Sequence, residues 1–347
     1  MRTVSVIGHL DWKENNMIGA VVKARNILEE LQNQLGETQV GNVDIYNWRK
    51  YKIRVLLDIV KAFVLYRNII LVCSDTSEQL MFFFNVLKRV FHNKILYAVV
   101  GGDIHVLLAQ NYTQVKRLSV IDVFFVETAD CVEGMKQLGI SNVELLRNFK
   151  CMESLSIDEL VLEHDGLFKF CTFSRVIEQK GITDAIQAVT DINREKGRKI
   201  CELDIYGTID ASYKEKFLQL MKDNEAVRYC GCVDSNNAVD VLKGYYCLLF
   251  PTKYQTEGIP GTIIDGFAAG VPVICADWVR CRQLVTDGKD GIVYPFNDYE
   301  ELVKKMNYAM EHTDYIFELK KGCIDSYTKY RADVAVKPLL DELKKGV

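Results

Sequence analysis

Short apolar runs recur along the whole chain, and stretches with a helical spacing of apolar residues lie between them. Short apolar runs bounded by turn residues are typical of buried parallel strands, and the helical stretches supply the crossover connections. This alternation predicts an α/β fold, with parallel sheets flanked by helices. The predicted strands are residues 3–7, 43–46, 69–73, 95–100, 123–126, 143–146, 168–173, 202–206, 227–229, 247–250, 272–275 and 291–294.

The alternation is interrupted at residues 154–163, which have no strong apolar pattern. A chain of 347 residues is longer than most single domains, so two domains are expected. We place the first at residues 1–150 and the second at 165–320. Helical spacing returns over 324–343, which predicts a terminal helix within a third segment, 324–347.

The segment 257–272, EGIPGTIIDGFAAGVP, predicts a strand end, a Gly/Pro loop and a short amphipathic helix. A helix start offers unpaired N–H donors and a partial positive charge, which suit an anionic ligand. Glu257 and Asp265 flank the loop, and carboxylates accept hydrogen bonds from vicinal hydroxyls. This pattern favours a site for a sugar and a ribose. The alternative is an ordinary helix with acidic residues on its solvated face.

Polar residues follow two other predicted strands. Arg175 and Lys180, next to Gly181, come after the strand 168–173 and form a candidate diphosphate clamp; solvated surface charges are the alternative. Asp103 and His105 come after the strand 95–100 and its glycine pair 101–102. They are candidate catalytic residues, the alternative being a tight turn with a surface histidine.

One glycine opens the first helical stretch. Gly19 follows the first strand and its polar loop, where it would let a ligand phosphate or sugar approach closely. The loop lacks the G-x-G-x-x-G pattern, so dinucleotide binding of the usual form is not supported.

Composition narrows the class of protein. A net charge of -4 gives no reason to expect a nucleic-acid partner. The 11 cysteines are scattered, and Cys230 with Cys232 is poor zinc spacing, so no metal site is predicted. Most of the cysteines lie in apolar runs and are typical of small core residues, which indicates a reducing cytosol. The chain opens on a strand pattern without the order of a signal peptide, and charges interrupt its most apolar stretch, 55–73.

Two segments of the first half, 48–67 and 82–94, interleave basic, aromatic and aliphatic residues. Such amphipathic helices suit a peripheral contact with anionic lipid headgroups, on the inner face of the plasma membrane for a cytoplasmic protein. The alternative is a pair of core-facing helices with solvated basic edges.

Taken together, these motifs resemble those of the retaining, nucleotide-sugar-dependent glycosyltransferases of family 4. The resemblance spans about residues 167–302 and is looser before them. It is carried by Ser174-Arg175 with Lys180-Gly181, Tyr229-Cys230-Gly231-Cys232-Val233, Phe250-Pro251-Thr252, the segment EGIPGTIIDGFAAGVPVI and Asp290-Gly291-Ile292-Val293.

The resemblance implies a GT-B fold, with two Rossmann-like domains facing each other across a cleft. The donor nucleotide would lie mainly on the second domain and the acceptor on the first. A final helix would cross back to the first domain. A nucleotide sugar would be the co-substrate, with no cofactor and no metal.

It also implies roles for individual residues. Arg175 and Lys180 would hold the diphosphate and stabilise the leaving nucleotide, and Glu257 would contact the transferred sugar. Asp265, where the family has glutamate, would accept hydrogen bonds from the ribose. The other expected donor contacts are Gly19, Gly207, Gly231, Cys232, Val233, Gly258, Ile259, Pro260, Gly261 and Thr262.

The leading hypothesis is a retaining hexosyltransferase that uses a UDP-sugar, or alternatively a GDP-sugar. It would glycosylate a hydroxyl of a saccharide or lipid-linked saccharide in capsule or cell-wall polysaccharide synthesis. One alternative is a non-catalytic GT-B partner or sugar-binding subunit. A further alternative is a GT-B epimerase or phosphorylase.

Overall fold

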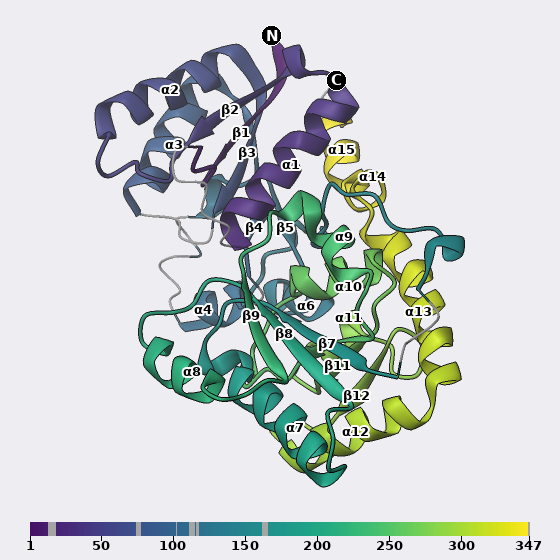
Figure 1. Cartoon of the computed structure of the whole chain (residues 1–347). Helices are drawn as coiled ribbons and strands as arrows, with labels where there is room; N and C mark the ends of the chain where they lie inside the picture. Colours follow the sequence, from purple (N-terminus) through teal and green to yellow (C-terminus); the bar gives the residue numbers. More distant parts are fainter. Residues whose placement is uncertain are drawn as a thin grey trace. The chain divides into compact units, whose positions relative to one another are not determined.

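The computed structural model describes residues 1–12, 19–73, 78–101, 103–110, 115, 118–161 and 166–345. These residues form two compact units. Unit 1 comprises Met1–Cys151 and Tyr330–Val347, and unit 2 comprises Met152–Lys329. Each unit contains one six-stranded sheet whose strands are all parallel, flanked by helices (Figure 1). This is the predicted α/β class.

The sheet of unit 1 has the strand order β2-β1-β3-β4-β5-β6. The order reverses direction between β1 and β3, which are hydrogen-bonded neighbours. The strands are β1 (Arg2–Gly8), β2 (Val40–Asp44), β3 (Tyr66–Cys73), β4 (Lys94–Val99), β5 (Val123–Val126) and β6 (Val143–Leu145).

Helices cover both faces of this sheet. One buried cluster joins the sheet to α2, α3 and α6, and another joins it to α1 and the C-terminal helices. The helices of unit 1 are α1 (Gly19–Leu35), α2 (Lys52–Leu65), α3 (Glu78–Phe91), α4 (Ile104–Gln110), α6 (Ala129–Gln137), α14 (Ala332–Ala335) and α15 (Lys337–Lys344).

Unit 2 repeats this architecture, with the strand order β12-β11-β10-β7-β8-β9. Its strands are β7 (Phe168–Phe173), β8 (Cys201–Tyr206), β9 (Val227–Gly231), β10 (Cys247–Phe250), β11 (Val273–Ala276) and β12 (Gly291–Tyr294). Its helices are α7 (Ile182–Glu195), α8 (Lys214–Met221), α9 (Ala238–Leu242), α10 (Gly261–Ala268), α11 (Cys281–Leu284), α12 (Tyr299–Glu311) and α13 (Thr313–Tyr327).

Most predicted strands differ from the observed ones by one to three residues at an end, and two differences have a clear cause in the structure. The strand predicted at 43–46 ends at Asp44, because its carboxylate accepts the backbone N–H groups of Leu10 and Tyr46 and turns the chain. The helix predicted over 324–343 is wrong. Its first residues end α13, and α14 and α15 follow a 3₁₀ turn at Thr328–Tyr330.

Within the described residues, no helix is long and apolar enough to cross a membrane. All eleven cysteines lie in that part of the chain, as thiols rather than disulfides. Most are buried among apolar side chains, as small core residues.

Candidate functional site

The site-forming edge of unit 2 follows from its topology. Successive strands lead away from β7 on one side and from β10 on the other, although β7 and β10 are neighbours. Ligands of open parallel sheets bind outside the carboxyl ends of the strands at such a reversal. The segments after these two strands meet there, because the N–H of Lys253 donates to the carbonyl of Gln179 at 2.8 Å.

A glycine permits this close approach. Gly181 has φ +71° and stands between the 3₁₀ turn Glu178–Lys180 and α7. A Cβ at this position would collide with the carbonyl oxygen of Pro251. Only glycine allows both the left-handed backbone and the contact between the two loops.

Lys180 and Glu257 form an ion pair at this edge. Lys180 Nζ lies 2.6 Å from Glu257 Oε2, and both side chains are largely shielded from solvent. The ammonium also lies 5.3 Å from the centroid of the Phe250 ring, in a cation–π contact. Two predicted site residues, 77 positions apart in the chain, are therefore brought together.

A threonine supports the carboxylate of this pair. Thr252 is buried, and its Oγ1 donates to Glu257 Oε2 at 3.2 Å while accepting the N–H of Tyr254 at 3.1 Å. Thr252 belongs to the motif Phe250-Pro251-Thr252, which helps to carry the family resemblance, but no role was predicted for it. The available signal in the sequence was its position just after the predicted strand 247–250.

Arg175 lies at the end of β7, in the same loop as Lys180. Its guanidinium is exposed and makes no hydrogen bond or ion pair within the part of the chain that the structure describes. Its charge nevertheless acts on Asp210: hydrogen bonds from Ser212 lower the pKa of that carboxyl, and Arg175 adds to the effect. An exposed guanidinium and a largely shielded ammonium in one loop are a suitable combination for a multiply charged anion.

Two more glycines hold the adjacent strand ends together. Gly207 has φ +132°, and a Cβ there would collide with the carbonyl oxygen of Ser174. Its N–H donates to the carbonyl of Gly231 at 2.8 Å, and Gly231 has φ +79°. Beyond it, Cys232 Sγ lies 3.3 Å from Thr208 Oγ1. The predicted residues Gly207, Gly231 and Cys232, followed by Val233, thus form one loop cluster after β8 and β9.

The start of α10 carries the remaining predicted residues of unit 2. Gly258 and Ile259 precede Pro260, the N-cap, whose side chain makes no capping bond, and Gly261 is the first helical residue. The hydroxyl oxygen of Thr262 is buried and has no hydrogen-bond partner among the described residues. Uncapped N–H groups at this helix start can donate hydrogen bonds to an anion.

Asp265 occupies a different environment from Glu257. It lies within α10 and is 1% exposed, whereas the sequence predicted it on the same side of a bound molecule as Glu257. A ribose therefore reaches this carboxylate only if the residues that cover it move. Its predicted contact with a ribose stays a prediction.

The three predicted residues of unit 1 lie after its own strands. Gly19 begins α1, and a Cβ there would meet nothing within 4 Å. Asp103 precedes α4, and its carbonyl accepts the N–H of Leu107. His105 lies on α4 rather than in a turn, with its ring against Gly134 of α6 and its Nδ1 buried without a hydrogen-bond partner in the described chain. Gly102 lies outside the described residues.

Unit 1 also contains a buried ion pair that the sequence analysis missed. Lys23 of α1 lies 2.6 Å from Glu127 and donates to the carbonyl of Val99, where β4 and β5 end. Residues 23, 27 and 30 share one buried helix face, so a lysine within an apolar helical stripe was the available signal.

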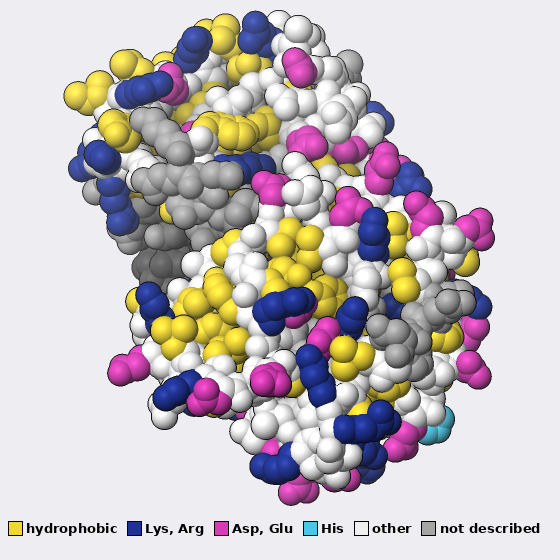
Figure 2. Space-filling model, in the orientation of Figure 1, with side chains coloured by type: hydrophobic (Ala, Val, Ile, Leu, Met, Phe, Trp, Pro, Cys, Tyr) yellow, Lys and Arg dark blue, Asp and Glu magenta, His cyan; other side chains and the backbone are white. Residues whose placement is uncertain are grey.

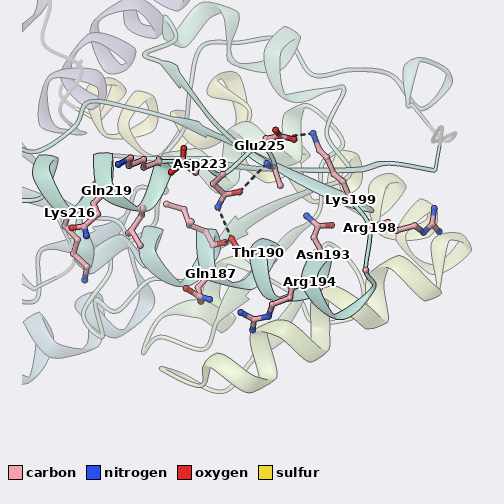
Figure 3. Close-up of a pocket in the computed structure, with 16 residues that line it drawn as sticks. Gln187, Thr190, Asn193, Arg194, Arg198, Lys199, Lys216, Gln219, Asp223 and Glu225 are labelled. Atoms are coloured by element: carbon pink, nitrogen blue, oxygen red, sulfur yellow. Dashed lines mark hydrogen bonds between the residues drawn. The ribbon is translucent and has the colours of Figure 1, made fainter.

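A groove of about 910 Å³ lies elsewhere on unit 2, between α7 and α8 (Figure 3). Its lining includes residues 197–199 and 222–226, which precede β8 and β9, so it lies at the amino ends of the strands. Several of its cations are already paired, such as Arg194 with Asp191 and Lys216 with Glu178. It contains none of the predicted site residues.

Comparison with known proteins finds a family match for most of the second unit. Residues 168–312 match the model of the family "Glycosyl transferases group 1". An uncharacterized glycosyltransferase of Methanocaldococcus jannaschii is 22% identical over 164 residues, 47% of this chain and 41% of that protein. An uncharacterized 41.2 kDa protein in the cps region of Klebsiella pneumoniae is 28% identical over 120 residues, 33% of this chain and 30% of that protein. The chain thus spans less than half the length of these relatives.

The fold of the whole chain has a counterpart among solved structures. The crystal structure of Anabaena HepE in complex with UDP is similar with a TM-score of 0.73, covering 99% of this chain and 100% of that one at 12% identity. Both six-stranded parallel sheets with their helices match this architecture. Residues 168–312 therefore match the glycosyl transferases group 1 family, and the chain has the fold of GT-B glycosyltransferase structures.

Proposed function

We propose that this protein is a retaining glycosyltransferase that moves a hexose from a nucleotide diphosphate sugar, a UDP-sugar in preference to a GDP-sugar, to a hydroxyl group. The observation that carries the proposal is the ion pair of Lys180 and Glu257 at the reversal point of the sheet in unit 2, with the exposed Arg175 in the same loop as Lys180. The family of residues 168–312 and the UDP bound by Anabaena HepE support it.

The two cations supply the main electrostatic term. Departure of a nucleoside diphosphate leaves negative charge on its phosphate oxygens, and fixed cations placed there lower the energy of the transition state. Before the donor binds, Glu257 and the ring of Phe250 hold the ammonium of Lys180 at this edge of the sheet. The N–H groups at the start of α10 add a second positive region, and no metal is required in this scheme.

Glu257 has a second role in the proposal. When the donor binds, the ammonium of Lys180 would form an ion pair with the diphosphate instead of Glu257. The carboxylate of Glu257 would then accept hydrogen bonds from hydroxyls of the transferred sugar. The hydroxyl of Thr252 keeps that carboxylate oriented. In a retaining reaction the acceptor attacks the face that the diphosphate leaves, and the leaving phosphate takes the acceptor proton.

The acceptor is proposed to be a saccharide or lipid-linked saccharide of a surface polysaccharide, assembled at the cytoplasmic side of the membrane. The relative in the cps region of Klebsiella pneumoniae supports this assignment. Asp103 and His105 of unit 1 are proposed on the acceptor side.

Calorimetric titration with UDP and GDP tests the donor assignment without knowledge of the acceptor. We expect the wild type to bind one nucleotide, and Arg175→Ala to weaken that binding by roughly 1–3 kcal/mol, the value of a charge-assisted hydrogen bond.

Arg198→Ala is the matched control, because Arg198 is an exposed arginine of the same unit at the opposite end of the sheet. It should leave the affinity unchanged. Binding of neither nucleotide by the wild type, or equal loss in both variants, would overturn the assignment.

A further inference from the structure

Helices α2 and α3 each expose a stripe of apolar side chains to solvent. On α2 the stripe contains Ile53, Leu57 and Val64, of which Ile53 is 78% exposed, and the partly buried Val60 lies along its edge, packed against the core. On α3 it contains Phe82, Val86 and Val90, and Phe82 is 73% exposed. Positions spaced by three or four residues share one face of a helix, so each set forms a continuous stripe.

These outward stripes are not needed for the core of unit 1. Each helix already buries a separate apolar face against the sheet, with Val55, Ile59 and Phe63 on α2 and Phe84 and Leu87 on α3. An ordinary surface helix has one apolar face and one polar face. A second apolar face on each of two neighbouring helices indicates an interaction surface.

The two stripes lie on the same side of unit 1. Both helices pack on one face of the sheet, within a single buried cluster, and the rings of Phe63 and Phe84 stack at 5.8 Å between them. Their outward faces therefore point away from the same sheet face. Figure 2 shows apolar and basic side chains together over the region that Figure 1 labels α2.

The charge around the stripes is strongly positive. Residues 48–67 and 82–94 carry nine lysine and arginine residues and one acidic residue, Asp58, in a chain of net charge -4. Lys88 and Lys94 are already paired with Asp122 and Glu342. Arg54 is paired with Asp58 at 3.9 Å on the exposed surface of α2. Other exposed cations of these segments are Arg49, Lys50, Lys52, Lys61 and Arg89.

We infer that this α2–α3 face binds the surface of an anionic lipid bilayer, with the apolar stripes inserted between headgroups and the cations over them. Apolar insertion with flanking positive charge is the combination that holds a helix in the plane of a membrane interface. A second copy of this chain fits less well, because pairing the face with itself would bring like charges together. The inference goes beyond the proposed function and does not depend on it.

Co-sedimentation with vesicles tests the inference on the full chain. The wild type should bind phosphatidylcholine vesicles that contain phosphatidylglycerol, and bind pure phosphatidylcholine vesicles much more weakly. Each cation near an anionic surface contributes about fivefold in partitioning, so the triple variant Lys50→Ser/Lys52→Ser/Lys61→Ser should lose about a hundredfold. The variant Ile53→Ser/Leu57→Ser/Phe82→Ser should lose binding to a similar degree.

The matched control is Leu218→Ser/Lys222→Ser, which removes an exposed apolar side chain and an exposed cation from α8 and its end in unit 2. It should bind as the wild type does. All substituted positions are exposed, and circular dichroism checks that each variant is folded. No binding of the wild type to anionic vesicles, or equal binding by all variants, would refute the inference. Sedimentation equilibrium that shows a dimer, lost in the stripe variant, would assign the face to a second copy instead.

Discussion

Thr252 shows how one buried hydroxyl supports the candidate site. It connects the end of β10 to Glu257 and, through its accepted N–H bond, shapes the loop at Tyr254. The ammonium of Lys180 and this hydroxyl both contact Oε2 of Glu257 and thereby hold its carboxylate. Thr252 is a positioning residue, because it would act through Glu257 rather than on a substrate.

Thr252→Val keeps the shape of the side chain and removes the hydroxyl. We expect a loss of about 1–2 kcal/mol in the free energy of unfolding, because the N–H of Tyr254 loses its partner. Urea denaturation measures it. Thr252→Ser retains the hydroxyl and should restore most of the stability.

The same variant separates binding from chemistry. UDP affinity should change little, because the proposed clamp is formed by Arg175 and Lys180. The rate of sugar transfer should fall about tenfold, the effect of one hydrogen bond lost at Glu257. A parallel loss of both quantities would contradict the positioning role.

Some residues of the site were predictable from sequence and some were not. Lys180 and Glu257 were each predicted as site residues near a strand end, and the resemblance to a glycosyltransferase family implied that both contact one donor. The burial of Asp265 was not predicted, since its helical position alone does not show which faces of α10 are covered by other elements. In the structure α10 contacts both α9 and α13.

At the level of elements, the connection from β7 to α7 determines the geometry of the site. The left-handed backbone of Gly181 turns the chain immediately after Lys180, and the loop after β10 packs onto it. The two loops that carry Lys180 and Glu257 therefore lie close enough for the ion pair only if Gly181 contacts Pro251.

Gly181→Ala should destabilise unit 2 by about 3 kcal/mol or more, since it adds both a left-handed alanine and a collision with Pro251. Gly197→Ala is the matched control: it has φ +64°, but a Cβ there meets nothing within 4 Å. It should cost only about 1 kcal/mol. Equal losses in urea denaturation would show that the contact with Pro251 is unimportant.

Strands were more predictable than helices. The predicted strands 123–126, 168–173, 247–250 and 291–294 have the bounds of β5, β7, β10 and β12. Strands of a parallel sheet are covered on both faces and thus read as continuous apolar runs. The break between α13 and α14 was missed, because apolar spacing continues through Thr328–Tyr330 although the chain changes direction.

At the scale of the whole molecule, buried thiols of unit 2 make the stability of the folded state depend on pH. Cys171, Cys247, Cys275 and Cys323 are completely buried, and desolvation raises the pKa of each thiol, to about 12 for Cys247. In the unfolded chain these thiols ionise near pH 9. Above that pH the folded state holds more protons than the unfolded state, so its stability falls as the pH rises.

The buried Lys320 has the opposite effect on the change of stability with pH. Desolvation lowers the pKa of its ammonium group, so the folded state releases this proton first and gains stability up to the usual pKa of 10.5. This group acts against the buried thiols over part of that pH range. We expect urea denaturation in a reducing buffer to show a net loss of stability between pH 8 and pH 10.

Two variants check the cause of this pH dependence. Cys247→Ala should reduce the loss by about 1.4 kcal/mol, since its thiol ionises over this pH range in the unfolded chain but not in the folded protein, where its pKa is about 12. Cys232→Ala, which removes an exposed thiol, should leave it unchanged. Equal stability of the wild type at pH 8 and pH 10 would contradict the assignment.

The division of the chain between the units has a consequence for synthesis on the ribosome. The core of unit 1 includes Val336, Leu339 and Leu343, which pack with residues of α1 and the sheet. These residues are translated after all of unit 2. The domain whose synthesis begins first therefore completes its core last, and a nascent chain can hold a finished unit 2 while the sheet of unit 1 still has one apolar face partly uncovered.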